Sequence, residues 1–197
     1  KGAGLIKNDK KPGGNITGIS NQAPVADQLR LVHQFMPNAK TLGIIYTSSD
    51  PSAESEHKQF VAQAKKMGLN LKSYSIANSN DLDQVSQQML SEVDAVIVPT
   101  DNTIAGATQT LVKTADTMVK DGGVATYSIN QYKLGVAGAK VVVAILKGKG
   151  KAKPETTAIE YIRHGEPVLN LKQANKLGLK VPKAFEKAAE DHGEVFK

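Results

Sequence analysis

The 197 residues are enough for one ordinary domain, or for one lobe and part of a second, and a hydrophobic content of 40% is compatible with a packed core. No apolar run approaches the length of a membrane-spanning helix, and the absence of cysteine excludes a disulfide scaffold, a thiolate metal site and a cysteine nucleophile. The net charge of +6 comes from lysines spread along the chain, with Arg30 and Arg163 as the only arginines, which is typical of a solvated basic surface rather than a nucleic-acid interface.

The first 40 residues contain two short predicted elements. Residues 1–14 have no periodicity and end in a Lys-Lys-Pro-Gly-Gly turn signal, so we expect a loop there. Residues 15–20 alternate like a brief strand. From residue 26, apolar side chains fall at helical spacing until Pro37 stops the pattern, which predicts a helix of about ten residues.

Residues 41–113 repeat a regular alternation of strands and helices. Apolar runs at 41–46 and 95–98, and an alternating run at 69–77, predict three strands. Amphipathic stretches from about 52 to 66, from 82 to 91 and from 104 to 113 predict the helices that follow them. This β-α-β-α-β-α order predicts an α/β fold with a parallel sheet and helices on both faces.

Two polar loops follow strands of this sheet. Ser48, Ser49 and Ser52 come after the strand at 41–46, while Asp101 and Asn102 come after the strand at 95–98. The carboxyl edge of an open parallel sheet is where small ligands bind, and a helix amino end favours an anionic group there. The same residue types are preferred helix caps, so capping remains an alternative for each loop.

The alternation fails after residue 113. Residues 115–123 follow the predicted helix without a new strand. A strand then resumes at 124–129, and residues 130–146 predict a helix rich in valine and leucine. The lysine-rich turn at 148–154 is typical of a solvated connection, and no phosphate-binding loop pattern is present.

The last 40 residues predict an extended segment at 156–162, a strand at 167–171 and two helices at 173–177 and 183–190. The four histidines lie in separate segments, without the spacing of metal ligands. The Gly-x-Ser-x-Gly motif of hydrolases is absent, and Ser, His and Asp do not occur in an order that indicates a catalytic triad. We therefore expect no metal, no cofactor and no catalytic residue.

Five segments together resemble the ABC-transporter substrate-binding lipoproteins of the tryptophan/tyrosine type. They are 12–20 (PGGNITGIS), 41–49 (TLGIIYTSS), 95–102 (AVIVPTDN), 125–135 (ATYSINQYKLG) and 170–178 (NLKQANKLG). The resemblance covers nearly the whole chain. It implies a two-lobed type I periplasmic-binding-protein fold, which closes over a small ligand and delivers it to an ABC permease in the membrane.

The resemblance also implies a domain division. Residues 1–18 would be a remnant of the first lobe, 19–123 the second, ligand-binding lobe, 124–156 a strand and helix returning to the first lobe, and 157–197 a crossing segment with elements docking on the second. The three crossings would fall near 18–20, 122–125 and 157–161. Relatives carry about a hundred residues before Lys1 and roughly fifteen between Thr117 and Met118, so we expect the first lobe to be largely missing from these residues.

The implied ligand is a zwitterionic solute, an aromatic or other hydrophobic amino acid. The implied contacts are Ser20, Ser48, Ser49, Ser52, Asp101, Asn102 and Asn130. The Asp101 carboxylate would take the ammonium, while hydroxyls and helix N–H groups would hold the carboxylate. The chain departs from the family at residues 50–53, where Asp-Pro-Ser-Ala replaces Glu-x-Asn-Ser.

Two functional classes follow from this fold. The favoured one is an extracytoplasmic solute-binding protein, anchored as a cell-surface lipoprotein or free in the periplasm. The alternative is the ligand-sensing domain of a LacI-like repressor, because one fold serves both. An amino-terminal helix-turn-helix would mark the repressor, and a signal peptide with a lipidated cysteine would mark the lipoprotein.

Overall fold

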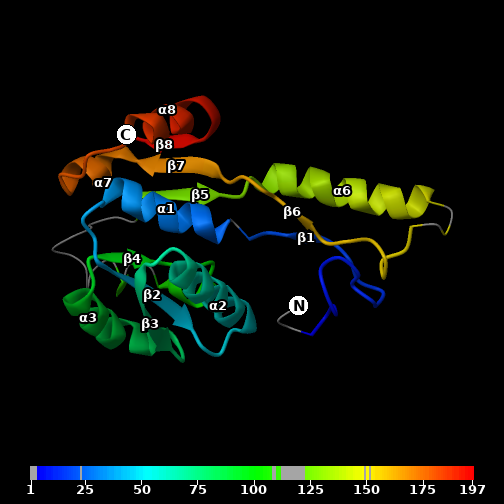
Figure 1. Ribbon diagram of the computed structural model, residues 1–197, viewed down its shortest axis with the longest axis horizontal. Coiled ribbons are helices and arrows are strands. Elements are labelled where there is room, and N and C mark those ends of the chain that lie inside the picture. Colours follow the sequence, from blue (N-terminus) through cyan, green and yellow to red (C-terminus); the bar gives the residue numbers. More distant parts are fainter. Residues whose placement is uncertain (1–3, 23, 108–109, 112–122, 149, 151) are drawn as a thin grey trace. The chain divides into compact units, whose positions relative to one another are not determined.

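The computed structural model describes residues 4–22, 24–107, 110–111, 123–148, 150 and 152–197, which form two compact units (Figure 1). Unit 1 contains residues 1–24 and 127–166, and unit 2 contains residues 25–126 and 167–197. The chain therefore passes between the units three times, after Pro24, Thr126 and Glu166. The division into lobes with crossings near 18–20, 122–125 and 157–161 stays a prediction.

Unit 2 is built on a three-stranded parallel sheet in the order β3-β2-β4. Its strands and the helices around them are β2 (Thr41–Thr47), β3 (Asn70–Ile76), β4 (Ala95–Ile97), α1 (Val25–Phe35), α2 (Pro51–Lys66), η1 (Ser79–Asp81), α3 (Leu82–Glu92) and α4 (Asn102–Gly106). This confirms the predicted parallel α/β architecture. The residues from 112 to 122, where the sequence predicted a missing strand between Thr117 and Met118, lie outside the described part of the chain.

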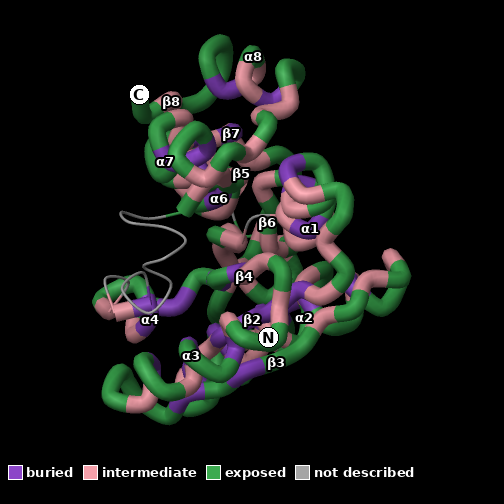
Figure 2. Tube along the Cα trace, turned by 90° about the vertical axis from the view of Figure 1, so that its left-hand side faces the viewer, coloured by how far each residue is buried: buried purple, intermediate pink, exposed green. Residues whose placement is uncertain are grey.

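The central strand β2 is buried on both faces, as its apolar sequence predicted (Figure 2). On one face, Leu42 and Ile44 pack with Leu29 of α1 and Phe60 of α2. On the other face, Ile45 packs with buried residues of β3 and α3. Successive strand residues point to opposite faces, so this one strand contributes to an apolar cluster on each face of the sheet.

Gly43 shows how closely α3 approaches β2. A Cβ atom at this position would lie 3.1 Å from Cγ of Met89 and 3.2 Å from Cγ2 of Val93. These distances are shorter than ordinary van der Waals contact, so a larger residue would push α3 away. Gly43 therefore lets Met89, which is fully buried, fill the core against the strand.

A second sheet, in the order β5-β7-β8, is formed by the later part of the chain. Its elements are β5 (Ala125–Ser128), β7 (Glu166–Asn170), α7 (Leu171–Lys176), α8 (Lys183–His192) and β8 (Glu194–Phe196). β7 and β8 are parallel. The sequence did not predict β8, because three residues are too few to show an alternating pattern.

Unit 1 contains one long helix and a small parallel sheet. Its elements are β1 (Ile19–Ser20), β6 (Glu160–Tyr161) and α6 (Gln131–Lys147). Ile19 reaches α6, since a Cβ atom on Gly138 would lie 3.5 Å from Cδ1 of Ile19. Val141 is the only buried residue of this 17-residue helix, although most of its sequence is apolar.

Candidate functional site

The carboxyl ends of β2 and β4 meet at one rim of the unit 2 sheet, and Asp101 joins them. Its Oδ2 accepts a hydrogen bond from the backbone N–H of Thr47 at 2.7 Å, and its Oδ1 accepts one from the Thr47 hydroxyl at 2.9 Å. Oδ1 also accepts from the N–H of Ile104 at 3.1 Å, which caps α4. Ser48 and Asp101 therefore lie on the same rim, as the parallel sheet predicted.

These bonds give Asp101 the capping role that the sequence left open. Its side chain is 3% exposed and both carboxylate oxygens are bonded within the protein. The structure therefore makes Asp101 a clamp between the end of β2 and the start of α4. Direct contact between this carboxylate and a solute stays a prediction that the geometry does not favour.

Ser48 and Ser49 are exposed just beyond β2. The Ser48 hydroxyl donates to the backbone carbonyl of Ile76 at 3.1 Å, and the Ser49 hydroxyl donates to the carbonyl of Ala77 at 3.0 Å. Both acceptors lie at the end of β3. The two side chains are thereby held at the rim instead of rotating freely in solvent.

The start of α2 is capped by Asp50. Its Oδ1 accepts from the N–H of Ser52 at 2.7 Å and from the N–H of Ala53 at 3.4 Å. The sequence predicted that a solute carboxylate would be held by the first N–H groups of this helix. The structure shows the capping alternative, because Asp50 occupies two of these N–H groups and places a negative charge there; a solute carboxylate at this helix end stays a prediction that the geometry does not favour.

Glu56 of α2 is a buried acidic residue at this rim that the sequence analysis missed. Its side chain is 7% exposed, and Oε2 accepts from the N–H of Thr100 at 3.3 Å. Burial raises the pKa of the Glu56 carboxyl, and hydrogen bonds from the backbone and side chain of Thr100 act against that rise. Glu56 lies three residues after Ala53 and four before Phe60, so it falls on the apolar stripe of α2. A carboxylate at this position is a signal in the sequence that could have revealed it.

The remaining rim residue, Asn102, is exposed at the start of α4. Together with Ser48, Ser49 and Ser52, it forms an exposed polar edge above the buried Asp101 and Glu56. We call this edge, with Thr100, the unit 2 rim. The five site residues that the sequence predicted in this unit thus follow the carboxyl ends of β2 and β4.

The other two predicted site residues, Ser20 and Asn130, belong to unit 1. Asn130 caps α6, because its Oδ1 accepts from the N–H of Lys133 at 3.1 Å, and its Nδ2 donates to Oε2 of Glu166 at 3.0 Å. The Ser20 hydroxyl accepts from the N–H of Gln22 at 3.4 Å. Both polar side chains therefore already have local structural roles.

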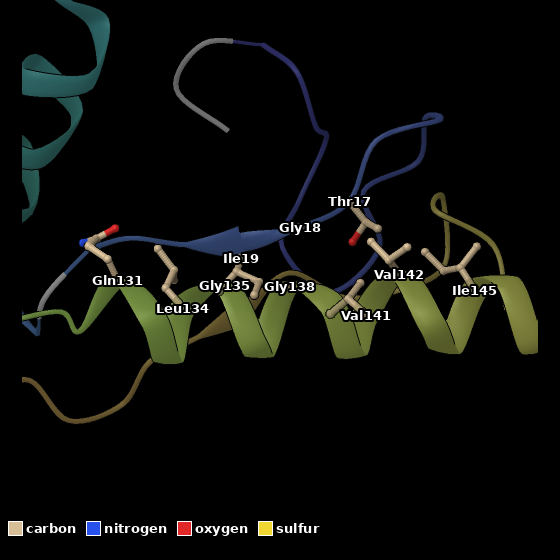
Figure 3. A pocket seen from close by; sticks show the side chains of 10 residues that line it. All are labelled: Thr17, Gly18, Ile19, Gln131, Leu134, Gly135, Gly138, Val141, Val142 and Ile145. Atoms are coloured by element: carbon tan, nitrogen blue, oxygen red, sulfur yellow. The ribbon is translucent and has the colours of Figure 1, made fainter.

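A shallow hollow of about 430 Å³ lies along α6 in unit 1. Figure 3 shows its lining along α6 and along the segment that carries β1. The lining residues are Thr17, Gly18, Ile19, Gln131, Leu134, Gly135, Gly138, Val141, Val142 and Ile145. Small-molecule sites usually combine apolar walls with several convergent polar groups, and this apolar lining offers few. The unit 2 rim is therefore the better candidate for a charged solute.

Among the described residues, no group of three or more His, Asp or Glu side chains is arranged to hold a metal ion. No helix in the described part of the chain combines the length and apolarity needed to cross a membrane.

Comparison with known proteins places the chain in a family. The family model described as "ABC transporter substrate binding protein" matches residues 1–193. A tyrosine-binding protein from Clostridioides difficile is 28% identical over 169 residues, which cover 80% of this chain and 49% of that protein. The chain thus spans about half the length of this curated relative.

Solved structures agree with the family model. An ABC domain from Streptococcus pneumonia in complex with L-Trp is 37% identical, with a TM-score of 0.84, and the match covers 99% of this chain and 68% of that one. A conserved domain protein from Vibrio cholerae is 26% identical, with a TM-score of 0.81, over 100% of this chain and 68% of that one. The ligand-free, open structure of a substrate-binding protein with adhesive properties from Clostridium difficile is 28% identical, with a TM-score of 0.71, over 92% and 64%. The chain belongs to the family of ABC transporter substrate-binding proteins.

Proposed function

We propose that the protein is the solute-binding component of an ABC import system and that its solute is an amino acid with an aromatic side chain. The observation that carries this proposal is the 37% identical structure, matched over 99% of this chain, which holds L-Trp. The relative named for tyrosine binding supports the same class of solute. Family membership favours this role over that of a LacI-like regulator, and the role requires no catalytic step.

The solute contacts that we propose in unit 2 are the exposed side chains of its rim. Ser48, Ser49, Ser52 and Asn102 present hydroxyl and amide groups of the kind that bind a zwitterion. Asp101 supports them from below by joining β2 to α4. Ser20 and Asn130 in unit 1 stay predicted contacts.

The proposed partner of the loaded protein is an ABC permease in the membrane. This proposal follows from the family, whose members supply solutes to such transporters. We place the protein outside the cytoplasm, at the cell surface as a lipoprotein or in the periplasm. Detection of the mature protein in a membrane fraction with an amino-terminal lipid would support the lipoprotein form.

A thermal-shift screen of the full-length protein tests the solute class. The panel contains the 20 common amino acids, ribose and a nucleoside. We expect L-tryptophan or L-tyrosine to raise the melting temperature, because a ligand at 100 times its Kd stabilises the folded state by about 3 kcal/mol. A shift with ribose or the nucleoside, and none with any amino acid, would contradict the proposal.

A further inference from the structure

Two hydroxyl groups of the unit 2 rim, those of Ser48 and Ser49, have already used their protons. A serine or threonine hydroxyl carries one proton and two acceptor lone pairs. Ser48 gives its proton to the carbonyl of Ile76, and Ser49 gives its proton to the carbonyl of Ala77. What these side chains offer to a solute is therefore hydrogen-bond acceptors.

Several backbone donors around these hydroxyls are also engaged. The N–H of Ser48 donates to the carbonyl of Ile76 at 2.9 Å, and the N–H of Thr47 donates to Asp101. Asp50 takes the first N–H groups of α2, and Glu56 takes the N–H of Thr100. These N–H groups are therefore not available to a solute carboxylate.

Negative charge lies directly behind the rim. Glu56 and Asp101 are both buried, and they are close enough for the charge of Asp101 to raise the pKa of Glu56. In the described part of the chain, no lysine, arginine or histidine forms a salt bridge with Glu56, Asp101 or Asp50. Unneutralised carboxylates produce a negative potential that attracts cations and repels anions.

We propose that Ser48, Ser49 and Thr100 form the subsite for the ammonium end of the solute, with Glu56 as the positioning residue that holds Thr100 in place. The inference rests on the proposed function and deepens it by assigning one end of the zwitterion. It reverses the expectation from the sequence that the hydroxyls of this rim hold the carboxylate. Glu56 acts through Thr100, which is exposed, because Glu56 itself is buried beneath it.

The first experiment varies the solute and the rim together. Titration calorimetry on the full-length protein compares L-tryptophan with 3-indolepropionate, which lacks the ammonium, and tryptamine, which lacks the carboxylate. We expect Ser48→Ala and Thr100→Val each to weaken the binding of L-tryptophan and tryptamine by about tenfold, the usual effect of losing a hydrogen bond to a charged group. Neither variant should change the affinity for 3-indolepropionate.

Two further variants serve as controls. Thr100→Ser keeps the hydroxyl and should restore the affinity for L-tryptophan. Ser91→Ala removes another exposed hydroxyl that donates to a backbone carbonyl, that of Gln88 in α3, and should leave binding unchanged. A loss of affinity for 3-indolepropionate alone, or equal losses for all three probes, would overturn the assignment.

Glu56→Gln provides a second measurement that depends on no analogue. The amide keeps an acceptor for the Thr100 N–H but removes the buried charge. We expect L-tryptophan to bind about tenfold more weakly, while the melting temperature of the unliganded protein at pH 7 rises. A residue with only a structural role would lower both affinity and melting temperature, and unchanged affinity would exclude the proposed role of Glu56.

The results separate the inference from the function on which it rests. If the wild-type protein binds L-tryptophan or L-tyrosine and the rim variants bind as tightly, the ammonium subsite is wrong and the proposed function stands. If the wild-type protein binds no amino acid, both proposals fail.

Discussion

In unit 2, the exposed polar residues of the rim stand on a closed core, whereas in unit 1 the exposed residues of α6 are themselves apolar. Both clusters of buried apolar side chains found among the described residues belong to unit 2. In α6, Val142 and Val143 are about half exposed, and Leu146 is 76% exposed. Among the described residues, unit 2 therefore has a packed core beneath its polar rim, whereas α6 of unit 1 has no such core beneath it.

Rigid support matters because a binding site must hold its polar groups in place without help from the solute. The rim obtains this support from bonds between elements, since Asp101 joins β4 and α4 to β2, and Glu56 joins α2 to the turn before α4. The hollow along α6 has only the short strand that carries Ile19 against it. A polar solute therefore has better-oriented partners in unit 2.

The largest expected difference between the two units is in the free energy of unfolding lost when an apolar side chain is shortened. Phe60→Ala removes a fully buried ring from the core of unit 2 and should lower the free energy of unfolding by about 4 kcal/mol. Leu146→Ala shortens an exposed side chain of α6 and should change it by about 0.5 kcal/mol or less. Urea unfolding of the full-length variants measures both. A loss at Leu146 as large as that at Phe60 would show that the α6 face is covered in solution.

The clamp at the rim should give the next largest effect. Asp101→Ala removes the carboxylate that accepts from the N–H groups of Thr47 and Ile104 and should cost about 3 kcal/mol. Asp101→Asn keeps one oxygen acceptor and should cost less. Equal stability of wild type and the alanine variant, measured by urea unfolding, would show that these bonds contribute little to the rim.

Much of the sheet could be predicted from the sequence because its signals are local. The apolar run at 41–46 became β2, and the alternating run at 69–77 became β3. Gly68 and Gly178, which follow α2 and α7, adopt positive φ angles as expected of residues that end helices. In each case a few neighbouring residues carry the whole signal.

The pairings at the site could not be predicted in this way. The bond from Thr100 to Glu56 joins residues 44 positions apart, and the bonds from Thr47 to Asp101 span 54. The sequence could place Asp101 at the rim and name capping as an alternative, but only the structure shows that its oxygens are used. Likewise, the sequence predicted a helix at 130–146, but only the structure shows that Val141 alone is buried in α6.

A smaller effect is expected from the cap of α2, which lies at the rim but outside the core. Asp50→Ala frees the N–H groups of Ser52 and Ala53 and should cost about 1 kcal/mol, the usual value for a helix cap. The same change also removes a negative charge next to Ser49. If the rim binds an ammonium, Asp50→Ala should weaken the binding of tryptamine more than the binding of 3-indolepropionate. Calorimetry measures both affinities, and a larger loss for 3-indolepropionate would contradict the ammonium assignment.

The smallest effect compares one ion-paired carboxylate from each unit, exposed in Glu92 and half-buried in Glu166. Glu92 in unit 2 accepts from Lys72 and Tyr74, and Glu166 in unit 1 accepts from Lys133 and Asn130; these bonds, with the lysine bond the strongest, lower the pKa of both carboxyls. A lowered folded-state pKa means that the unfolded chain binds a proton first as the pH falls, so each group stabilises the fold above its ordinary carboxyl pKa and loses that contribution in acid.

Urea midpoints between pH 7 and pH 3 should therefore fall less steeply for Glu92→Gln and Glu166→Gln than for the wild-type protein. The change should be slight for both, because exposed pairs are screened by solvent. The two variants should differ in which urea-unfolding transition changes its pH dependence. Glu92 is joined to β3, a strand of the unit 2 sheet, so its substitution should flatten the main cooperative transition. Glu166 is joined to the start of α6, so its substitution should change only the unfolding signal of that helix. If the two units unfold together, both variants should instead flatten the pH dependence of one shared transition.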